Sequence, residues 1–354
     1  MSNLDKFREC VRQGPWDALL LTSQVNRRYA AEYDIAEGMA LITAEDAYYF
    51  TDSRYFEDAE KYLPDFSVQL VDREHPYSAR ILAVTSVGMS VLGFEEAYMT
   101  VAEYRALSKK VPVQWKPAQT EISSFRIVKT DAEFAAMRKA QQITDQTFSE
   151  LLNIIRVGMT EMEIKTELLY QLYRNGSEGP SFDPIVISGA KTSVPHGVSG
   201  QKKLEPGDFV TMDFGCKYNG YCSDMTRTVA MGYATEEMQK VYQTVLDAQA
   251  AALSISKAGL TGKVIDAAAR DVIVAAGYGA YFGHSYGHGL GLEVHEAPNC
   301  APSWDRALPE GCVCSAEPGI YLPGKFGVRI EDVVRMTASG CDNLTESPKN
   351  LLIL

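Results

Sequence analysis

The chain has 354 residues, which is long for a single compact core and favours two domains. Its apolar content of 46% and charged content of 23% are ordinary for a globular protein and exclude a largely disordered one. The net charge of −12 disfavours a nucleic-acid partner, and no apolar run is long enough to cross a bilayer. The N-terminus lacks the apolar core of a secretory signal, so we expect a cytoplasmic protein without a membrane partner. Its seven cysteines, an odd number, are expected to be free thiols.

The first part of the chain alternates short apolar runs with helical patterns. Strands are predicted at 17–22, 38–43, 47–52 and 66–71, and helices at 54–63 and 100–110. This alternation is typical of an α/β layer domain. A proline and a polar stretch follow, and they place the domain boundary between 1–123 and 124–354.

The second part of the chain opens with two helix-start signals. Thr130 with Glu133, and Thr160 with Glu163, have the spacing of a capping box, and Gly176 can end the second helix. Two more helices are predicted, at 235–257 and 264–276. The segments between the helices are typical of strands, so we expect an α+β domain in which helices and antiparallel hairpins are separate.

The first predicted hairpin covers 209–231 and turns at Asn219-Gly220, the strongest short signal for a two-residue turn. Counting outward from this turn places Asp213 and Asp224 on one face, as diagonal neighbours with Cβ atoms roughly 7 Å apart. Two carboxylates at that separation repel each other unless a cation or a proton lies between them.

The second predicted hairpin covers 312–336 and turns at a proline–glycine pair. Glu317 and Glu331 lie at comparable distances from this turn and can sit side by side, and alternation puts Arg329 on the face of Glu331. Charged groups are costly to bury in strands that are otherwise apolar. Acids on both hairpins therefore indicate a shared pair of divalent ions.

Residues 287–296, GHGLGLEVHE, place His288 and His295 seven positions apart in a glycine-rich run. The glycines argue against a helix, whereas Leu290 and Leu292 suit a buried, extended path; a mobile loop is the alternative. A histidine held there can give a neutral nitrogen to a metal. The spacing is not H-E-x-x-H, which excludes the zincin helix.

Together these motifs resemble those of the metal-dependent pita-bread peptidases. The resemblance is carried, in this order, by DFG, SDMTRT, GHGLGLEVHE, EPGIY and RIED. That family includes methionine aminopeptidases, Xaa-Pro aminopeptidases and prolidases, with creatinase as a relative. The segments 51–59 and 125–134 are similar to the two-domain members. The resemblance implies a creatinase/prolidase-type α/β N-terminal domain followed by an α+β pita-bread catalytic domain.

The resemblance also implies roles for individual residues. The positions that match the family's metal ligands are Asp213, Asp224, His288, Glu317 and Glu331. They imply two divalent ions per subunit, with Mn²⁺ first and Co²⁺ or Zn²⁺ as alternatives. The matching catalytic positions are His196, His295 and Glu317, and the matching substrate-binding positions are His284 and Arg329. Glu317 would transfer the proton of the attacking water, His295 would stabilise the oxyanion, and Arg329 would hold substrate or brace a ligand.

Within the family, the length and the N-terminal domain disfavour methionine aminopeptidase. The complete ligand set argues against two rivals, a non-catalytic peptide-binding module and a metal-independent creatinase-like hydrolase. Asn299 stands where some prolidases carry an arginine that grips a dipeptide's carboxylate. The resemblance therefore favours an Xaa-Pro aminopeptidase acting on peptides with proline at the second position, with Xaa-Pro dipeptidase as the alternative. It also implies a homodimer.

Overall fold

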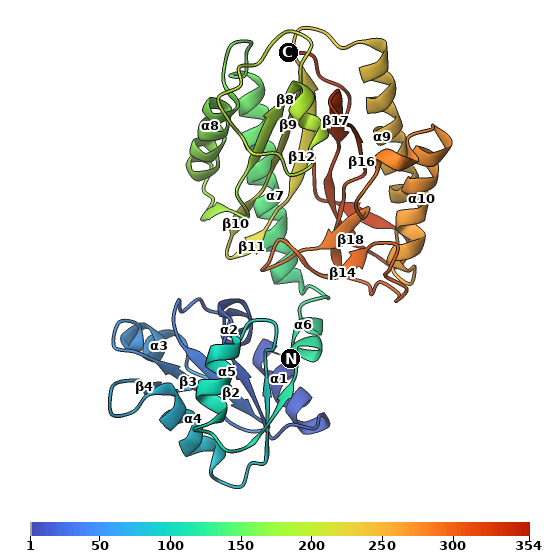
Figure 1. Cartoon of the computed structure of the whole chain (residues 1–354). Helices are drawn as coiled ribbons and strands as arrows, with labels where there is room; N and C mark the ends of the chain where they lie inside the picture. The colour runs from blue at the N-terminus through green and yellow to red at the C-terminus, as the bar shows by residue number, and fades with distance from the viewer. Residues whose placement is uncertain (1) are drawn as a thin grey trace. The chain divides into compact units, whose positions relative to one another are not determined.

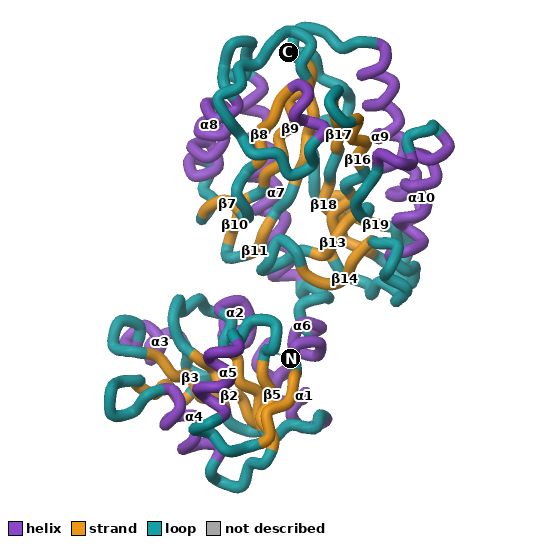
Figure 2. Tube along the Cα trace, in the orientation of Figure 1, coloured by secondary structure: helices purple, strands orange, loops and turns teal. Residues whose placement is uncertain are grey.

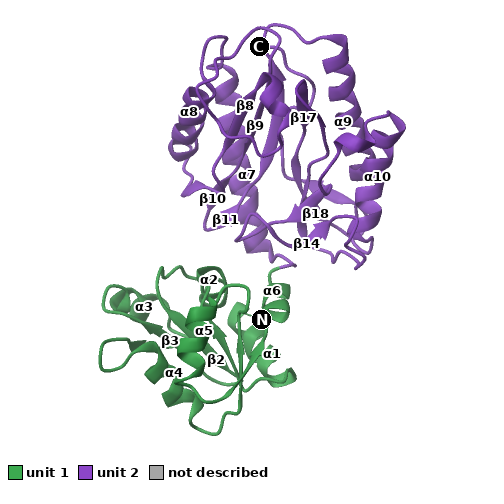
Figure 3. Cartoon of the chain, in the orientation of Figure 1, with its two compact units in different colours: residues 1–126 green, residues 127–354 purple. Residues whose placement is uncertain are grey.

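The structure, a computed structural model, describes residues 2–354. The chain divides into two compact units, residues 1–126 and residues 127–354, each with its own core (Figure 3). None of the helices in the described part of the chain is both long and apolar enough to cross a membrane. All seven cysteines are free, as predicted.

The first unit is built on one mixed, six-stranded sheet of order β4-β3-β2-β1-β5-β6 (Figure 1). Its strands are β1 (Ala18–Leu21), β2 (Met39–Thr43), β3 (Ala47–Thr51), β4 (Ser67–Leu70), β5 (Val91–Phe94) and β6 (Gln114–Pro117). Its helices are α1 (Asn3–Gln13), α2 (Gln24–Ala31), α3 (Phe56–Tyr62), α4 (Tyr77–Thr85), α5 (Val101–Ser108) and α6 (Gln119–Ser124). Every residue of β1 is buried: the strand lies inside the sheet between antiparallel β2 and parallel β5, and Ala18 and Leu20 share the unit's core with Ile81 of α4. The α/β layer prediction is confirmed.

The second unit begins with the two predicted helices, α7 (Asp131–Leu152) and α8 (Glu161–Arg174). Both begin with a complete capping box, at Thr130 and at Thr160, as the sequence predicts. The helices share a core with β8 (Ile185–Ser188), β9 (Phe209–Phe214) and β12 (Met225–Ala230), which form an antiparallel sheet. A smaller sheet beside it contains β7 (Gly179–Pro180), β10 (Cys216–Tyr218) and β11 (Tyr221–Cys222).

The rest of the second unit repeats this order of a helix pair followed by a hairpin. Helices α9 (Glu236–Ile255) and α10 (Gly262–Ala275) share a core with the strands that follow them. A five-stranded sheet has the order β14 (Glu296–Cys300), β13 (Gly287–Gly289), β15 (Val313–Ala316), β18 (Asp332–Met336) and β19 (Cys341–Asn343). Strands β16 (Gly319–Leu322) and β17 (Phe326–Arg329) form a hairpin, and η1 (Gly189–Ser193) and η2 (Gly279–Tyr281) are short 3₁₀ helices. Figures 1 and 2 show the central strands of this unit between α8 on one flank and α9 and α10 on the other. The predicted α+β domain with separate helices and antiparallel hairpins is confirmed.

Candidate metal centre

The first hairpin has the register that its turn predicts. Asn219 and Gly220 both have positive φ, 47° and 73°, as a tight two-residue turn of this kind requires. The register continues from β10–β11 into β9–β12, where Asp213 lies opposite Thr226. Asp224, two residues before Thr226, therefore lies diagonally across from Asp213 on the same face.

The second hairpin also keeps a single register through two consecutive ladders. Ala316 lies opposite Asp332 in β15–β18, and the same register holds in β16–β17. Glu317 and Glu331 occupy the facing positions between these ladders, as the distances from the turn suggest. Both acids thus stand where the backbone pairing is interrupted.

His288 lies on β13, between two glycines that let the backbones approach. A Cβ atom on Gly287 would lie 2.1 Å from the carbonyl oxygen of Ser315, and one on Gly289 would be 2.6 Å from the neighbouring strand. The amide of His288 donates to Ser315 Oγ at 3.0 Å, and this hydroxyl donates to Glu317 Oε1 at 3.0 Å. The expected extended path is confirmed, and it brings the imidazole to the acids of the second hairpin.

The five predicted ligands line one cavity, and three of them lie close enough together to hold one metal ion. Asp224, His288 and Glu331 each offer a ligand atom, and these atoms lie within 4.8 Å of one another. His288 Nε2 lies 3.6 Å from Asp224 Oδ2 and 3.2 Å from Glu317 Oε1. Asp213 and Glu317 complete the set on the cavity wall. Asp224 Oδ1 is buried and has no hydrogen-bond partner among the described residues, so it is an acceptor that a cation would satisfy.

Keeping the carboxyl groups of this cluster ionised costs free energy, because they are buried and close to one another. Burial, reinforced by the neighbouring carboxylates, raises the pKa values of Asp224 and Glu331 well above their ordinary range. Burial also raises the pKa of Asp213, although the Arg329 guanidinium opposes the shift. Positive ions would remove this cost. A set of carboxylate oxygens with one imidazole suits Mn²⁺, Co²⁺ or Zn²⁺, so the residues present fit a pair of divalent ions.

His288 and Glu317 stabilise each other's charged forms. Burial opposes ionisation of both, but the hydrogen bond between them and their opposite charges outweigh it. The pKa of His288 is raised to about 9, and the pKa of Glu317 is lowered to about 2. At neutral pH these shifts favour an imidazolium beside a carboxylate, and a metal ion bound by His288 would have to displace the imidazolium proton.

Arg329 is buried beside the predicted ligands and is bonded to one of them. Its Nη2 donates to Asp213 Oδ2 at 2.6 Å, with only 4% and 12% of the two side chains exposed. Its Nη1 donates to the hydroxyl of Tyr321 at 3.0 Å, and that hydroxyl lies 2.8 Å from His284 Nε2. Tyr321 is a cavity residue for which the sequence alone predicted no role. Strand alternation could have found it, because Tyr321 stands four residues after Glu317 and so shares its face.

Three of the four remaining histidines belong to the cavity, and the fourth lies in the first unit. His196, His284 and His295 line the same cavity, whose volume is about 910 Å³. The ring of His295 lies 4.2 Å from that of His288, and burial together with the charge of His288 lowers the pKa of His295. Burial lowers the pKa of His284 as well. His75 belongs to the first unit, where its half-exposed side chain is paired with an aspartate.

Comparison with known families agrees with this geometry over both units. Residues 135–338 match the metallopeptidase family M24, and residues 3–128 match the creatinase/prolidase N-terminal domain. The chain belongs to the metallopeptidase family M24, with a creatinase-type α/β domain ahead of a pita-bread catalytic domain. The family and the fold class expected from the motifs are both confirmed.

Similar proteins of known structure cover the whole chain. An Xaa-Pro dipeptidase from Bacillus anthracis is 40% identical, with a TM-score of 0.96 and 99% of each chain covered. An X-Pro aminopeptidase from Thermotoga maritima is 35% identical, with a TM-score of 0.92 and complete coverage of both chains. A curated Xaa-Pro dipeptidase from Pyrococcus horikoshii is 34% identical over 349 residues, which is 98% of this chain and 97% of that protein. The relatives' names are thus divided between two related activities.

Proposed function

We propose that this protein is a metal-dependent Xaa-Pro aminopeptidase, which hydrolyses the bond between an N-terminal residue and a following proline. The observation that carries the proposal is the convergence of five ligand-type side chains on one cavity, with an unsatisfied Asp224 oxygen among them. The proposed ligands are Asp213, Asp224, His288, Glu317 and Glu331. When bound there, two divalent ions, Mn²⁺ in the first instance, would supply a water of lowered pKa as the nucleophile.

The protein's own groups suit the proton transfers of peptide hydrolysis. Glu317 lies on the cavity wall beside the other proposed ligands, where its carboxylate can accept the proton of the attacking water for transfer to the leaving nitrogen. His295 has a lowered pKa, so it is neutral and can donate a hydrogen bond to the substrate carbonyl oxygen as negative charge develops there. His196, whose side chain is exposed at the cavity, would contact the proline side.

Two further positions would contact or support the substrate. His284 lines the cavity and is held by Tyr321, so its ring has a defined direction. Arg329 is already engaged by Asp213, which supports a role in bracing that ligand. Contact of Arg329 with substrate stays a prediction.

The charges around the cavity favour the aminopeptidase over the dipeptidase. A dipeptide presents a free carboxylate next to its proline, whereas a longer peptide does not. Among the cavity-lining residues that the structure describes, Arg329 alone carries a guanidinium or ammonium group, and Asp213 neutralises it. Asn299, which also lines the cavity, is uncharged. The volume of about 910 Å³ lies near the upper end for small-molecule sites and leaves room for residues beyond proline.

The dipeptidase is the second candidate, because two of the three similar proteins described above are named Xaa-Pro dipeptidases. The test is to load the protein with Mn²⁺, Co²⁺ or Zn²⁺ and follow release of the first residue from Xaa-Pro and Xaa-Pro-Yaa peptides. We expect the tripeptides to have the higher kcat/KM. Cleavage of dipeptides alone would overturn the choice of activity, and no cleavage with any metal would overturn the peptidase.

A matched variant sharpens this test. Asn299→Arg would place a cation on the cavity wall, and we expect it to lower KM for dipeptides more than for tripeptides. An equal effect on both substrates would show that position 299 does not face the substrate carboxylate.

A further inference from the structure

A fully buried carboxylate lies beneath the loop that carries His196. Glu161 is the first residue of α8, and none of its surface is exposed. Its Oε1 accepts hydrogen bonds from the amide and the hydroxyl of Ser188, at 2.8 and 3.0 Å. Its Oε2 accepts from Lys191 Nζ at 2.5 Å and from the amide of Gly200 at 2.9 Å. One side chain thus binds both ends of residues 189–199, which we call the His196 loop.

These contacts match the chemistry of a carboxylate and of no other side chain of this size. The four groups that bond to Glu161, on three residues, are all donors, and an ionised carboxylate offers acceptor sites only. A glutamine would direct an amide NH₂ at donors from one end of the loop. It would also leave the Lys191 ammonium without its ion-pair partner. Such a buried, fully bonded group fixes the backbone around it.

The middle of the His196 loop is bonded to β17. The amide of Gly327 donates to Thr192 Oγ1 at 2.8 Å, and Arg329 Nη1 donates to the carbonyl of Pro195 at 3.3 Å. Arg329 is the residue that also bonds to the proposed ligand Asp213. His196 follows Pro195 directly, and its side chain is exposed at the cavity. The position of this imidazole is therefore set by the course of the loop.

We propose that Glu161 is a positioning residue for His196: by binding both ends of the loop, it fixes where the imidazole stands relative to the substrate. This inference rests on the proposed function, because it requires His196 to act on a peptide. A misplacement of about 1 Å can cost roughly 100-fold in rate. We therefore expect Glu161→Gln to lower kcat/KM for an Xaa-Pro-Yaa peptide by about 10- to 100-fold, while metal content stays at the wild-type value.

The test is a double-mutant cycle. Glu161→Gln, His196→Ala and the double variant are loaded with Mn²⁺ and assayed on the same peptide. If Glu161 acts through His196, Glu161→Gln should lower kcat/KM by less than about 3-fold when it is made in His196→Ala. A loss of equal size in both backgrounds, or a loss of bound metal in Glu161→Gln, overturns the proposal.

Hydrogen exchange of the loop gives a readout that does not depend on turnover. Residues 189–199 should exchange faster in Glu161→Gln than in the wild type. The matched control is Glu163→Gln, in the same helical turn, because Glu163 binds the amide of Thr160 at 2.7 Å and does not belong to the loop contacts. Unchanged loop exchange in Glu161→Gln, or an equal increase in Glu163→Gln, overturns the proposal.

Three further outcomes can be told apart. If Glu161→Gln does not fold, Lys191→Met replaces it, because this variant removes one of the four donors to Glu161 and leaves three. We expect Lys191→Met to speed hydrogen exchange of the loop. It should lower kcat/KM when His196 is present and leave kcat/KM unchanged in His196→Ala. If His196→Ala is fully active, the assigned role of His196 is wrong and so is the positioning of a catalytic group. If the wild-type protein has no peptidase activity, the proposed function is refuted. The hydrogen-exchange data would then still show whether Glu161 holds the loop.

Discussion

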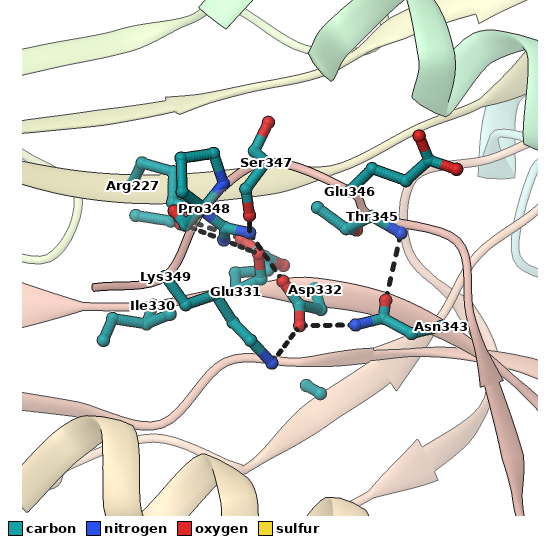
Figure 4. A network of polar contacts seen from close by, with 12 residues as sticks. Arg227, Ile330, Glu331, Asp332, Asn343, Thr345, Glu346, Ser347, Pro348 and Lys349 are labelled. Atoms are coloured by element: carbon teal, nitrogen blue, oxygen red, sulfur yellow. Dashed lines mark hydrogen bonds and ion pairs between the residues drawn. The ribbon is translucent and has the colours of Figure 1, made fainter.

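Replacing Arg227 with methionine should destabilise the second unit more than any surface substitution. Arg227 lies on β12 with 1% of its side chain exposed, and it joins β12 to β18 and to the C-terminal segment (Figure 4). Its guanidinium donates to the carbonyl oxygens of Thr226, Glu331, Ser347 and Pro348 and to the carboxylate of Asp332. The substitution removes all of these donors while leaving the acceptors buried.

The expected loss in the free energy of unfolding follows from the burial of the ion pair between Arg227 and Asp332. Arg227 Nη2 lies 2.8 Å from Asp332 Oδ1, and the two side chains are 1% and 0% exposed. Removing one partner of such a pair costs about 3–5 kcal/mol, a large part of the 5–15 kcal/mol that stabilises a typical domain. Lys349 Nζ also reaches Asp332, at 2.8 Å, and offsets part of the loss, whereas the carbonyl groups left without a donor add to it. We therefore expect a loss of at least about 3 kcal/mol.

The assay is urea-dependent hydrogen exchange of the metal-free protein, read in peptides from β12 and from the C-terminal segment. These peptides report on the second unit alone. Lys325→Met is the control, because Lys325 forms an exposed ion pair with Glu237 in the same unit, and we expect little change. Arg227→Lys should lie between the two, since an ammonium cannot reach all the acceptors of a guanidinium. A loss below about 1 kcal/mol in Arg227→Met would refute the reasoning.

Two more predictions concern the proposed metal centre, and a third concerns a buried ion pair elsewhere in the second unit. Asp224→Asn should keep the fold, by circular dichroism, but lose bound metal by elemental analysis and turnover by peptide assay; a variant with full metal content would contradict the ligand assignment. Metal affinity should rise as pH rises toward 9, because the pKa of His288 is raised from its ordinary value to about 9 and its proton must leave before the nitrogen can bind a metal. Calorimetry at pH 7 in two buffers of different ionisation enthalpy should show at least one proton released, and no release would contradict this view. Lys129→Met should lower the free energy of unfolding by about 3–5 kcal/mol, because Lys129 pairs with Glu296 at 2.8 Å with 2% and 4% of the side chains exposed; a chemical denaturation midpoint equal to that of the wild type would exclude this cost.

Much of the proposed site could be predicted because its geometry is local to two turns. A two-residue turn at Asn219-Gly220 sets every pairing of its hairpin, so the diagonal relation of Asp213 and Asp224 follows from counting. The helix starts at Thr130 and elsewhere were equally local, since a capping box spans only one helical turn. A capping box at Ser2 also begins α1, although no helix was predicted there.

Contacts between segments far apart in the chain were not predictable in this way. Glu161 meets Ser188 and Gly200, which are 27 and 39 positions away, and nothing in a capping pattern indicates such partners. Arg227 reaches carbonyl groups more than 100 positions along the chain. The sequence around Glu161 is already explained by the start of a helix, and the sequence around Arg227 by a strand. Neither local pattern indicates a distant partner.

The sequence by itself determined the registers of the two hairpins that carry the acids and the starts of the capped helices α7 and α8, because turn geometry, alternation and capping act between neighbouring residues. Only the tertiary structure decided which hairpin faces which, how closely His288 approaches Glu317, and which buried charges hold the loops in place. These depend on packing two hairpins and a glycine-rich strand around one cavity, where burial and mutual charge shift each pKa by amounts that no single segment contains.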